Sequence, residues 1–474
     1  MRNWKLRKPF DRAFGEGSGA LARTLGWPHL IAMGVGAIVG TGILTLIGVG
    51  AAKAGPAVLV AFVIAGFVCA CAALAYAEMA TLVPASGGAY TYSYVAVGQL
   101  AAWMIGWSLI LEYSLVVSAV SVGWSGYAAP LLHDWLGVPW ALMNGPHAGG
   151  IVNLPAVAII GGVAAMLIYG MRSSASVNAL LVLVKVSALV AFVWMAAPHF
   201  DSANLSPFNP FGFAKSTGAE GVERGIMAAA AIIFSAFYGF DAIATAAEET
   251  RNPRRDLAIG IIGSMLACAA IYTLVAGAAL GAVGFRDFAD SPEPLALVLR
   301  RLGEPEAARF LALSAVVALP TVILAFFYGQ SRIFFVMARD GLLPRGLARV
   351  SSSGAPVRTT LFTVLIVGTI AAFFPLNEIV ALANAGTLVA FAAVAVSMLV
   401  LRRRAPDAPR GYRAPAAWLV GPVAIAGCVY LFVSLPSTTH WWFLVWNALG
   451  VALYWAYAGR ARPDTDHAGE VRDG

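Results

Sequence analysis

Four glycines interrupt an apolar segment near the N-terminus, in residues 34–43 with the sequence GVGAIVGTGI. A glycine inside a helix costs about 1 kcal/mol relative to alanine. In lipid, any backbone group freed by such an interruption must find another partner or line a cavity. The stretch therefore has two interpretations. It is a face where small residues let helices pack closely, or a broken transmembrane helix whose exposed backbone binds a small charged ligand.

A second interrupted segment occupies residues 232–242, with the sequence IIFSAFYGFDA. Gly239 breaks the apolar run here, and Asp241 follows shortly after it. The N-terminus of a helix carries about half a positive charge and free N–H groups, which suit a carboxylate. Unwound carbonyl groups on the opposite side suit an ammonium group. Two facing breaks therefore describe a site for a zwitterion, and hence for an α-amino acid.

Two charged residues, Lys185 and Glu112, lie near the middle of apolar segments. A lysine at the centre of a transmembrane helix costs about 2.5–3.5 kcal/mol on insertion scales, whereas a lysine that reaches the interface lies near a helix end. Lys185 is therefore interpreted as functional, and Asn178 is expected on the same helix face. Glu112 has two interpretations: a functional charge, or a structural carboxylate bonded to a Tyr or Ser.

Other polar residues have structural interpretations beside functional ones. Glu78, Asp241 and the charges in 248–256 form either ion pairs of an inner gate or ordinary solvated charges. A stripe of serines at helical spacing favours close helix packing over substrate contact: Ser114, Ser118, Ser121 and Ser125. The cysteines and histidines have no metal-ligand spacing, so no metal site is predicted. Because the sequence has no nucleophile elbow, P-loop or zinc motif, we do not expect an enzyme.

The elements that must position these residues are predicted to be transmembrane helices. The chain has 474 residues, of which 60% are hydrophobic and 12% charged, and its mean hydropathy is +0.78. Soluble proteins have about 25% charged residues, and about 20 apolar residues form one helical span. The sequence therefore predicts an all-α polytopic membrane protein with twelve spans: 29–50, 56–83, 100–130, 153–170, 176–196, 226–248, 256–284, 307–338, 357–375, 378–401, 415–435 and 441–458.

The distribution of basic residues predicts how these spans are oriented. If the N-terminus is cytoplasmic, most of the 31 Lys and Arg residues fall in inner segments, as the positive-inside rule requires. We therefore expect a multi-pass protein of the inner (plasma) membrane with both termini in the cytoplasm. The formal charge of +7 is spread over several inner segments rather than gathered in one stripe. Nucleic acid is accordingly not an expected partner.

The two interrupted segments are the first and sixth predicted spans, at corresponding positions of two five-span halves. Such halves insert in opposite orientations, which gives an inverted repeat of the leucine-transporter type with the substrate at the breaks. The predicted divisions are a cytoplasmic segment 1–28, a transmembrane domain 29–458 and a cytoplasmic tail 459–474. Within the membrane domain, 29–196 and 226–401 are the two repeats, and 415–458 holds accessory helices 11 and 12.

Three blocks of sequence resemble the amino acid, polyamine and organocation (APC) superfamily, and within it the bacterial twelve-span form of the cationic amino acid transporter (CAT) family. They are residues 34–43, 239–257 and 328–344, and the resemblance covers nearly the whole chain. It implies that backbone groups around Thr41 and Gly42 hold the substrate carboxylate, and that carbonyl groups at both breaks hold its amine. The implied substrate-binding residues are Ile38, Gly40, Thr41, Gly42, Phe234, Ser235, Ala236, Phe237 and Tyr238.

The same resemblance assigns roles to several side chains. Phe234 and Phe237 would be gate or pocket-wall residues, although ordinary packing is equally consistent for Phe237. Tyr238 departs from the family pattern, in which this position is more often aliphatic, and it favours a small substrate. Lys185 would take the place of a sodium ion and couple transport to protons. Glu112 would be a partner for Lys185, or a contact for a positively charged substrate.

The sequence thus predicts a secondary transporter that imports L-amino acids by proton symport and alternating access, without a cofactor. Its expected partners are the amino acid, protons and the lipid bilayer, and no protein partner is identified. One alternative is an exchanger of amino acids that uses no protons. Another is a receptor that senses an amino acid without moving it, although a sensor is expected to carry a cytoplasmic signalling domain. The substrate is either cationic or small and neutral.

Overall fold

The computed structural model describes residues 7–8, 25–85, 87–169, 175–218, 222–289, 291–344 and 357–456. Within these ranges the chain is almost entirely helical, and its one sheet is the antiparallel pair β1 (Ser216–Thr217) and β2 (Glu223–Arg224). The α-helices are α2 (Trp27–Ile38), α3 (Thr41–Leu44), α4 (Leu46–Ala54), α5 (Val58–Leu82), α6 (Ala89–Ala96), α7 (Gln99–Leu136), α8 (Leu154–Ile168), α9 (Ala175–Ala196), α10 (Ile226–Ile233), α11 (Asp241–Thr245), α12 (Pro253–Ala282), α13 (Pro294–Arg301), α14 (Pro305–Ala318), α15 (Pro320–Arg339), α16 (Val357–Phe373), α17 (Leu376–Arg404), α18 (Ala417–Val433) and α19 (Ser437–Ala456).

The apolar helices are long enough for a multi-pass membrane protein. Within the described ranges, eight helical segments are long and apolar enough to cross a bilayer, or nine if α18 and α19, bent by 110°, form one span. Two shorter apolar helices lie in 154–168 and 360–373. Each of the twelve predicted ranges overlaps described helices. The polytopic all-α class is therefore confirmed, and the number twelve stays a prediction.

Large apolar side chains remain exposed on the outward faces of the peripheral helices. On α9 they include Leu180, Leu183 and Trp194, and on α19 they include Trp441 and Trp442. Water would penalise such surfaces by about 25 cal/mol per Å² of apolar area. Hydrocarbon removes this penalty, so the pattern of exposure fits a chain surrounded by lipid.

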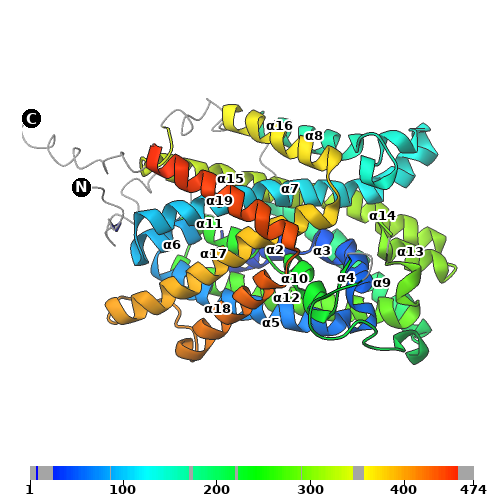
Figure 1. Ribbon diagram of the computed structural model, residues 1–474, viewed down its shortest axis with the longest axis horizontal. Helices are drawn as coiled ribbons and strands as arrows, with labels where there is room; N and C mark the ends of the chain where they lie inside the picture. Colours follow the sequence, from blue (N-terminus) through cyan, green and yellow to red (C-terminus); the bar gives the residue numbers. More distant parts are fainter. Residues whose placement is uncertain are drawn as a thin grey trace, which may run out of the picture.

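Both interrupted segments are broken helices. The first runs from α2 through residues 39–40 into α3 and α4, and the second from α10 through a 3₁₀ turn, η6 (Phe234–Ala236), and residues 237–240 into α11. These segments lie in the middle of the molecule (Figure 1), where α2 packs against α9, α12 and α15, and α10 packs against α4, α5 and α17. The breaks are thus surrounded by intact helices that can supply partners for their freed backbone groups.

The two ends of the molecule are closed by shorter elements. In Figure 1, α6 lies towards one end of the long axis and α13 towards the other. At the end with α6, Asp340 accepts hydrogen bonds from Lys8 at 2.8 Å and from the Tyr90 hydroxyl at 2.9 Å. On the loop that carries β1 and β2, Lys215 pairs with Glu223 at 3.3 Å.

Candidate functional site

Lys185 on α9 holds the carbonyl groups of the first break. Its ammonium donates hydrogen bonds to the carbonyl oxygens of Gly36 at 2.6 Å and Val39 at 2.8 Å. In an intact helix Gly36 would accept its hydrogen bond from the N–H of Gly40, four residues later. The lysine side chain is 3% exposed, and no carboxylate pairs with it within the described ranges. A buried ammonium therefore replaces donors that the break removes.

Tyr272 on α12 holds the same break from another side. Its hydroxyl donates to the carbonyl oxygen of Ile38 at 2.7 Å. The tyrosine is completely buried. One hydroxyl thus satisfies an acceptor of the unwound backbone. The chain between α2 and α3 is fixed by two side chains from two different helices.

The second break depends on a glycine and a carboxylate. Gly239 has φ = 123°, a conformation that side chains with a Cβ atom rarely adopt. Its N–H donates to the Asp241 carboxylate at 3.0 Å, and the other carboxylate oxygen accepts from the Tyr113 hydroxyl at 2.7 Å. Asp241 therefore fixes the turn that restarts the helix, and it is tied to α7 through Tyr113.

The two breaks contact each other through their backbones. A Cβ atom at Gly42 would overlap with the backbone of Ala236, and one at Gly239 would lie 3.0 Å from the carbonyl carbon of Ala37. Gly34 lies against Ser264 and Ile243 with no room for a side chain. Some glycines of the run therefore permit close packing, and the helix is broken at residues 39–40. That the broken backbone binds a charged ligand stays a prediction.

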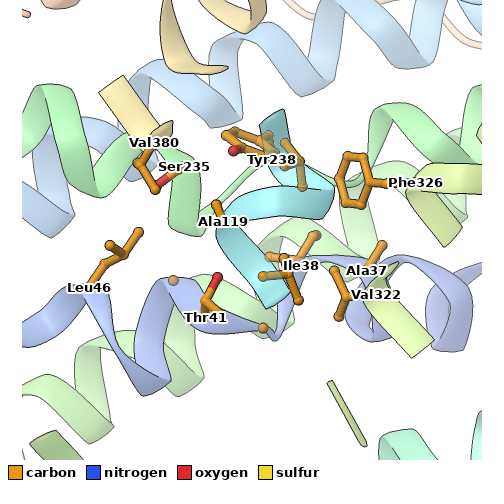
Figure 2. Close-up of a pocket in the computed structure, with 14 residues that line it drawn as sticks. Ala37, Ile38, Thr41, Leu46, Ala119, Ser235, Tyr238, Val322, Phe326 and Val380 are labelled. Carbon is orange, nitrogen blue, oxygen red and sulfur yellow. The ribbon is translucent and has the colours of Figure 1, made fainter. Parts of the chain in front are cut away.

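A small cavity lies beside the two breaks. Its volume is about 20 Å³, roughly enough for a single water molecule. In Figure 2, Ile38 and Thr41 lie on one side of it, Tyr238 and Ser235 on the opposite side, and Phe326 at its edge. The complete lining is Ala37, Ile38, Gly40, Thr41, Gly42, Leu46, Val116, Ala119, Val120, Ser235, Tyr238, Val322, Phe326 and Val380.

Comparison with known proteins decides the class of this chain. The amino acid permease family model matches residues 25–457. The chain belongs to the amino acid permease family. The branched-chain amino acid permease BcaP of Bacillus subtilis is 40% identical over 450 residues, which is 94% of each chain. This permease is therefore a transporter and not an enzyme.

Two further relatives show how widely substrates vary in the family. The methylthioribose transporter of Bacillus subtilis is 36% identical over 95% of this chain and 97% of its own. The human cationic amino acid transporter 4 is 34% identical over 85% of this chain and 63% of its own. The resemblance to the APC superfamily and to cationic amino acid transporters is thus confirmed. The relatives are named for different substrates.

The permease brings most of the predicted binding residues to the cavity, but not all of them. Phe237 packs edge-on against Phe62 and Tyr272, and Phe234 lies against Tyr238 and Phe391. Ala236 supports the first break from behind. These three predicted residues are packing residues in this arrangement. The predicted residues that line the cavity are Ile38, Gly40, Thr41, Gly42, Ser235 and Tyr238.

Glu112 lies away from Lys185, in a different polar environment. The glutamate is completely buried on α7, and both its carboxylate oxygens lack a hydrogen-bond partner among the described residues. The nearby Thr387 hydroxyl donates instead to Ala383 of its own helix at 3.2 Å. The structure contains no ion pair between Glu112 and Lys185. The structural interpretation expected a tyrosine or serine to donate a hydrogen bond to Glu112, and the described part of the chain contains no such bond.

The remaining polar predictions have mixed outcomes. Two of the stripe serines bond between helices, Ser118 to the Val367 carbonyl at 3.0 Å and Ser125 to Asn153 at 2.6 Å, which fits the packing interpretation.

Among the inner charges, Glu249 pairs with Arg332. Glu78 accepts from Arg402 at 2.5 Å and from Arg410 at 3.1 Å. The side chains of Asn178 and Glu248 and the segment 459–474 lie outside the described residues.

The cavity wall and two residues that support the breaks were not predicted from the sequence. The wall residues Val116, Val322 and Val380 are ordinary apolar positions on three helices, and nothing in their type marks them as functional. Tyr272 and Asn384 are polar residues in apolar spans, which is a usable signal. Asn384 on α17 donates to two carbonyl groups of the second break.

Proposed function

We propose that this permease imports L-amino acids across the bacterial inner membrane by proton-coupled symport. The observation that carries the proposal is the Lys185 ammonium on the carbonyls of Gly36 and Val39, directly at the first break and next to the cavity. An ionisable group at this depth is costly, and it is functional by default. Its protonation state is therefore connected to the backbone that binds the substrate.

The substrate lies between the two breaks in this proposal. Backbone N–H groups around Thr41 and Gly42 lie in the first turn after the break, where no preceding turn offers them a carbonyl acceptor. These free N–H groups bind the substrate carboxylate. Carbonyl groups near Ile38, Ser235 and Tyr238 receive the ammonium group. This assignment is supported by the cavity, which touches all five residues.

Proton movement is linked to substrate release through Lys185. A protonated lysine forms charge-assisted hydrogen bonds, about twice as strong as neutral ones, and thereby holds the first break in the closed arrangement. Loss of the proton towards the cytoplasm weakens these bonds and frees the break to move. A second cavity, of about 10 Å³ and bordered by Lys185, Val39 and Ser314, leaves local room for this change.

Glu112 is the second proton-coupling residue of the proposal. It lies in the apolar interior near Asp241, and neither carboxylate forms an ion pair within the described ranges. A buried carboxyl group that has neither a cation nor a hydrogen-bond donor favours its neutral, protonated form. A proton gained or lost at Glu112 would change the charge near Asp241, which restarts the helix after the second break.

Neutral aliphatic amino acids are the proposed substrates. Most side chains of the cavity wall are aliphatic (Val, Ala, Ile and Leu), and Glu112 does not line it. The relative named as a branched-chain amino acid permease fits this wall better than the relatives named as cationic amino acid transporters. The present cavity is smaller than any amino acid, so the site must open before binding.

The proposed architecture extends the observed helices into twelve spans with both termini in the cytoplasm. Spans in 29–196 and 226–401 form the inverted repeat, 415–458 contributes accessory helices, and 1–28 and 459–474 are cytoplasmic. Alternating access then moves one part of the bundle against another around the two breaks. The proposal is supported by breaks at corresponding positions of the two halves.

Proteoliposomes test the proposal directly. Purified protein is reconstituted, an inward proton gradient is imposed, and uptake is measured for a panel of labelled neutral and cationic amino acids. Accumulation of a neutral aliphatic amino acid that collapses with a protonophore is the expected result. Uptake only into vesicles preloaded with amino acid would replace symport by exchange. Binding without any uptake would favour a sensor.

A further inference from the structure

Asn384 lies at the second break but has no role in the proposed function above. It is completely buried on α17, and its amide nitrogen donates to the carbonyl oxygens of Ala231 at 2.7 Å and Ile232 at 3.1 Å. These two carbonyls belong to the last turn of α10. They precede the change to the 3₁₀ turn η6 at Phe234, where the regular hydrogen-bond pattern of an α-helix ends.

The contacts of Asn384 fix the orientation of its amide group. Both N–H donors point at carbonyl oxygens, and the reversed orientation would place the amide oxygen against two acceptors. The amide oxygen accordingly points elsewhere and is buried without a hydrogen-bond partner among the described residues. An unmatched buried oxygen costs folding free energy. An apolar residue would fill this space without that cost, so packing alone does not explain why an asparagine stands here.

Asn384 is also placed to influence the cavity. Val380, one helical turn earlier on the same face of α17, lines the cavity together with Ser235. The Ser235 hydroxyl donates to the Ile232 carbonyl at 2.7 Å, the same carbonyl that Asn384 holds. A shift at Ile232 would therefore move Ser235, and with it the wall of the site.

We propose that Asn384 is a positioning residue that clamps the end of α10 at the second break. Its amide cannot gain or lose a proton in the physiological range, unlike the ammonium of Lys185 at the first break. Protonation at Lys185 then acts on the first break, while α17 holds the start of the second in place. The inference rests on the proposed function for its effect on transport, but not for its effect on the backbone.

Asn384→Asp is the decisive variant, because it keeps the size of the side chain and makes the clamp titratable. An ionised carboxylate has no donor and repels the two carbonyls, whereas a protonated carboxyl group can donate to one of them. We expect uptake of the panel's best amino acid to have a KM raised about tenfold at alkaline pH. Acidification should restore much of the loss beyond the response of the wild type.

Hydrogen–deuterium exchange of the purified protein tests the clamp without any transport. Relative to wild type at the same pH, Asn384→Asp and Asn384→Leu should exchange faster in 231–240 and remain unchanged in 34–43. Lys185→Ala should exchange faster in 34–43 and remain unchanged in 231–240. Ser397→Ala is the matched control, since Ser397 is also buried on α17 but bonds only to Ala393 of its own helix.

The outcomes separate this inference from the functional proposal. If Asn384→Asp and Asn384→Leu exchange like Ser397→Ala in 231–240, the clamp is overturned, whatever the wild type transports. Faster exchange in 231–240 in a protein that shows no uptake leaves the clamp standing and overturns the functional proposal. If the wild type takes up amino acid and Asn384→Asp has the same KM and pH profile, the positioning role is also rejected.

Discussion

The two broken helices solve the same backbone problem with different chemistry. At the first break, carbonyls are held by the Lys185 ammonium and the Tyr272 hydroxyl. At the second, they are held by the Asn384 amide, and the restarted helix is fixed by Asp241. The carbonyl groups of the first break are thus held by an ionisable ammonium and a hydroxyl, and those of the second by an amide that does not titrate.

The contact between the breaks gives this asymmetry a consequence. Gly42 lies directly on the Ala236 backbone, and Gly239 lies on the backbone of Ala37. The first break therefore moves directly against the backbone of the second, because no flexible side chain separates them. A fixed second break provides the surface against which the first one closes.

Loss of the titratable support should have the largest effect. Lys185→Ala leaves the carbonyls of Gly36 and Val39 without their donor and removes the proton site. Uptake driven by a proton gradient should fall about 100-fold, near the upper end of ordinary coupling between two ligands. The measurement is initial uptake in proteoliposomes with and without the gradient.

Lys53→Ala provides a matched control for that experiment. Like Lys185, Lys53 donates to a backbone carbonyl, that of Glu223 at 3.1 Å, but it is only partly buried and lies at the end of α4 away from the breaks. Its removal should leave gradient-driven uptake within about twofold of wild type. Equal uptake by Lys185→Ala and Lys53→Ala would remove the proposed distinction between the two breaks.

The broken helices were predictable from sequence because glycine and buried charge are rare and costly in apolar spans. Residues 34–43, Gly239 and Lys185 were all identified in this way, and the structure places them together. The wall of the cavity was not predictable, since Val116 and Val322 are valines like many others in the apolar helices. Which aromatic side chain faces the cavity depends on the rotation of each helix, so Phe237 was assigned to the site although it packs against Phe62.

A methyl group at the contact between the breaks should have the next largest effect. In Gly42→Ala the new Cβ would overlap with the Ala236 backbone, whereas in Gly40→Ala it would lie 3.4 Å from a side-chain carbon of Val322. Overpacking costs about 1–3 kcal/mol, so substrate affinity should fall about tenfold or more in Gly42→Ala. Gly40→Ala should be clearly milder. Binding by calorimetry checks this order, and a reversed order would contradict direct contact of the breaks.

Removal of a neutral support from the first break should have a moderate effect. Tyr272→Phe deprives the Ile38 carbonyl of its donor, while the ring keeps its contacts with Phe62 and Phe237. Unsatisfied buried groups cost about 1–3 kcal/mol, so KM should rise about fivefold or more. The pH dependence of uptake should keep its wild-type shape, because Lys185 is still present. A displaced pH profile would show that Tyr272 takes part in proton coupling itself.

The smallest effect is expected at Ser235, and it tests whether the second break is held from α17 or from within its own turn. The Ser235 hydroxyl and Asn384 share the Ile232 carbonyl. In Ser235→Ala this carbonyl keeps its bond to Asn384, so KM should rise only about twofold, in line with one lost hydrogen bond of about 0.5 kcal/mol. In the Asn384→Leu background the same serine is the last side-chain donor to that carbonyl, and its removal should cost more than in wild type. Uptake kinetics of the two single variants and the double variant measure this coupling. Strictly additive effects would mean that the two donors support the break independently, and the clamp on α17 would then no longer explain why the second break stays fixed.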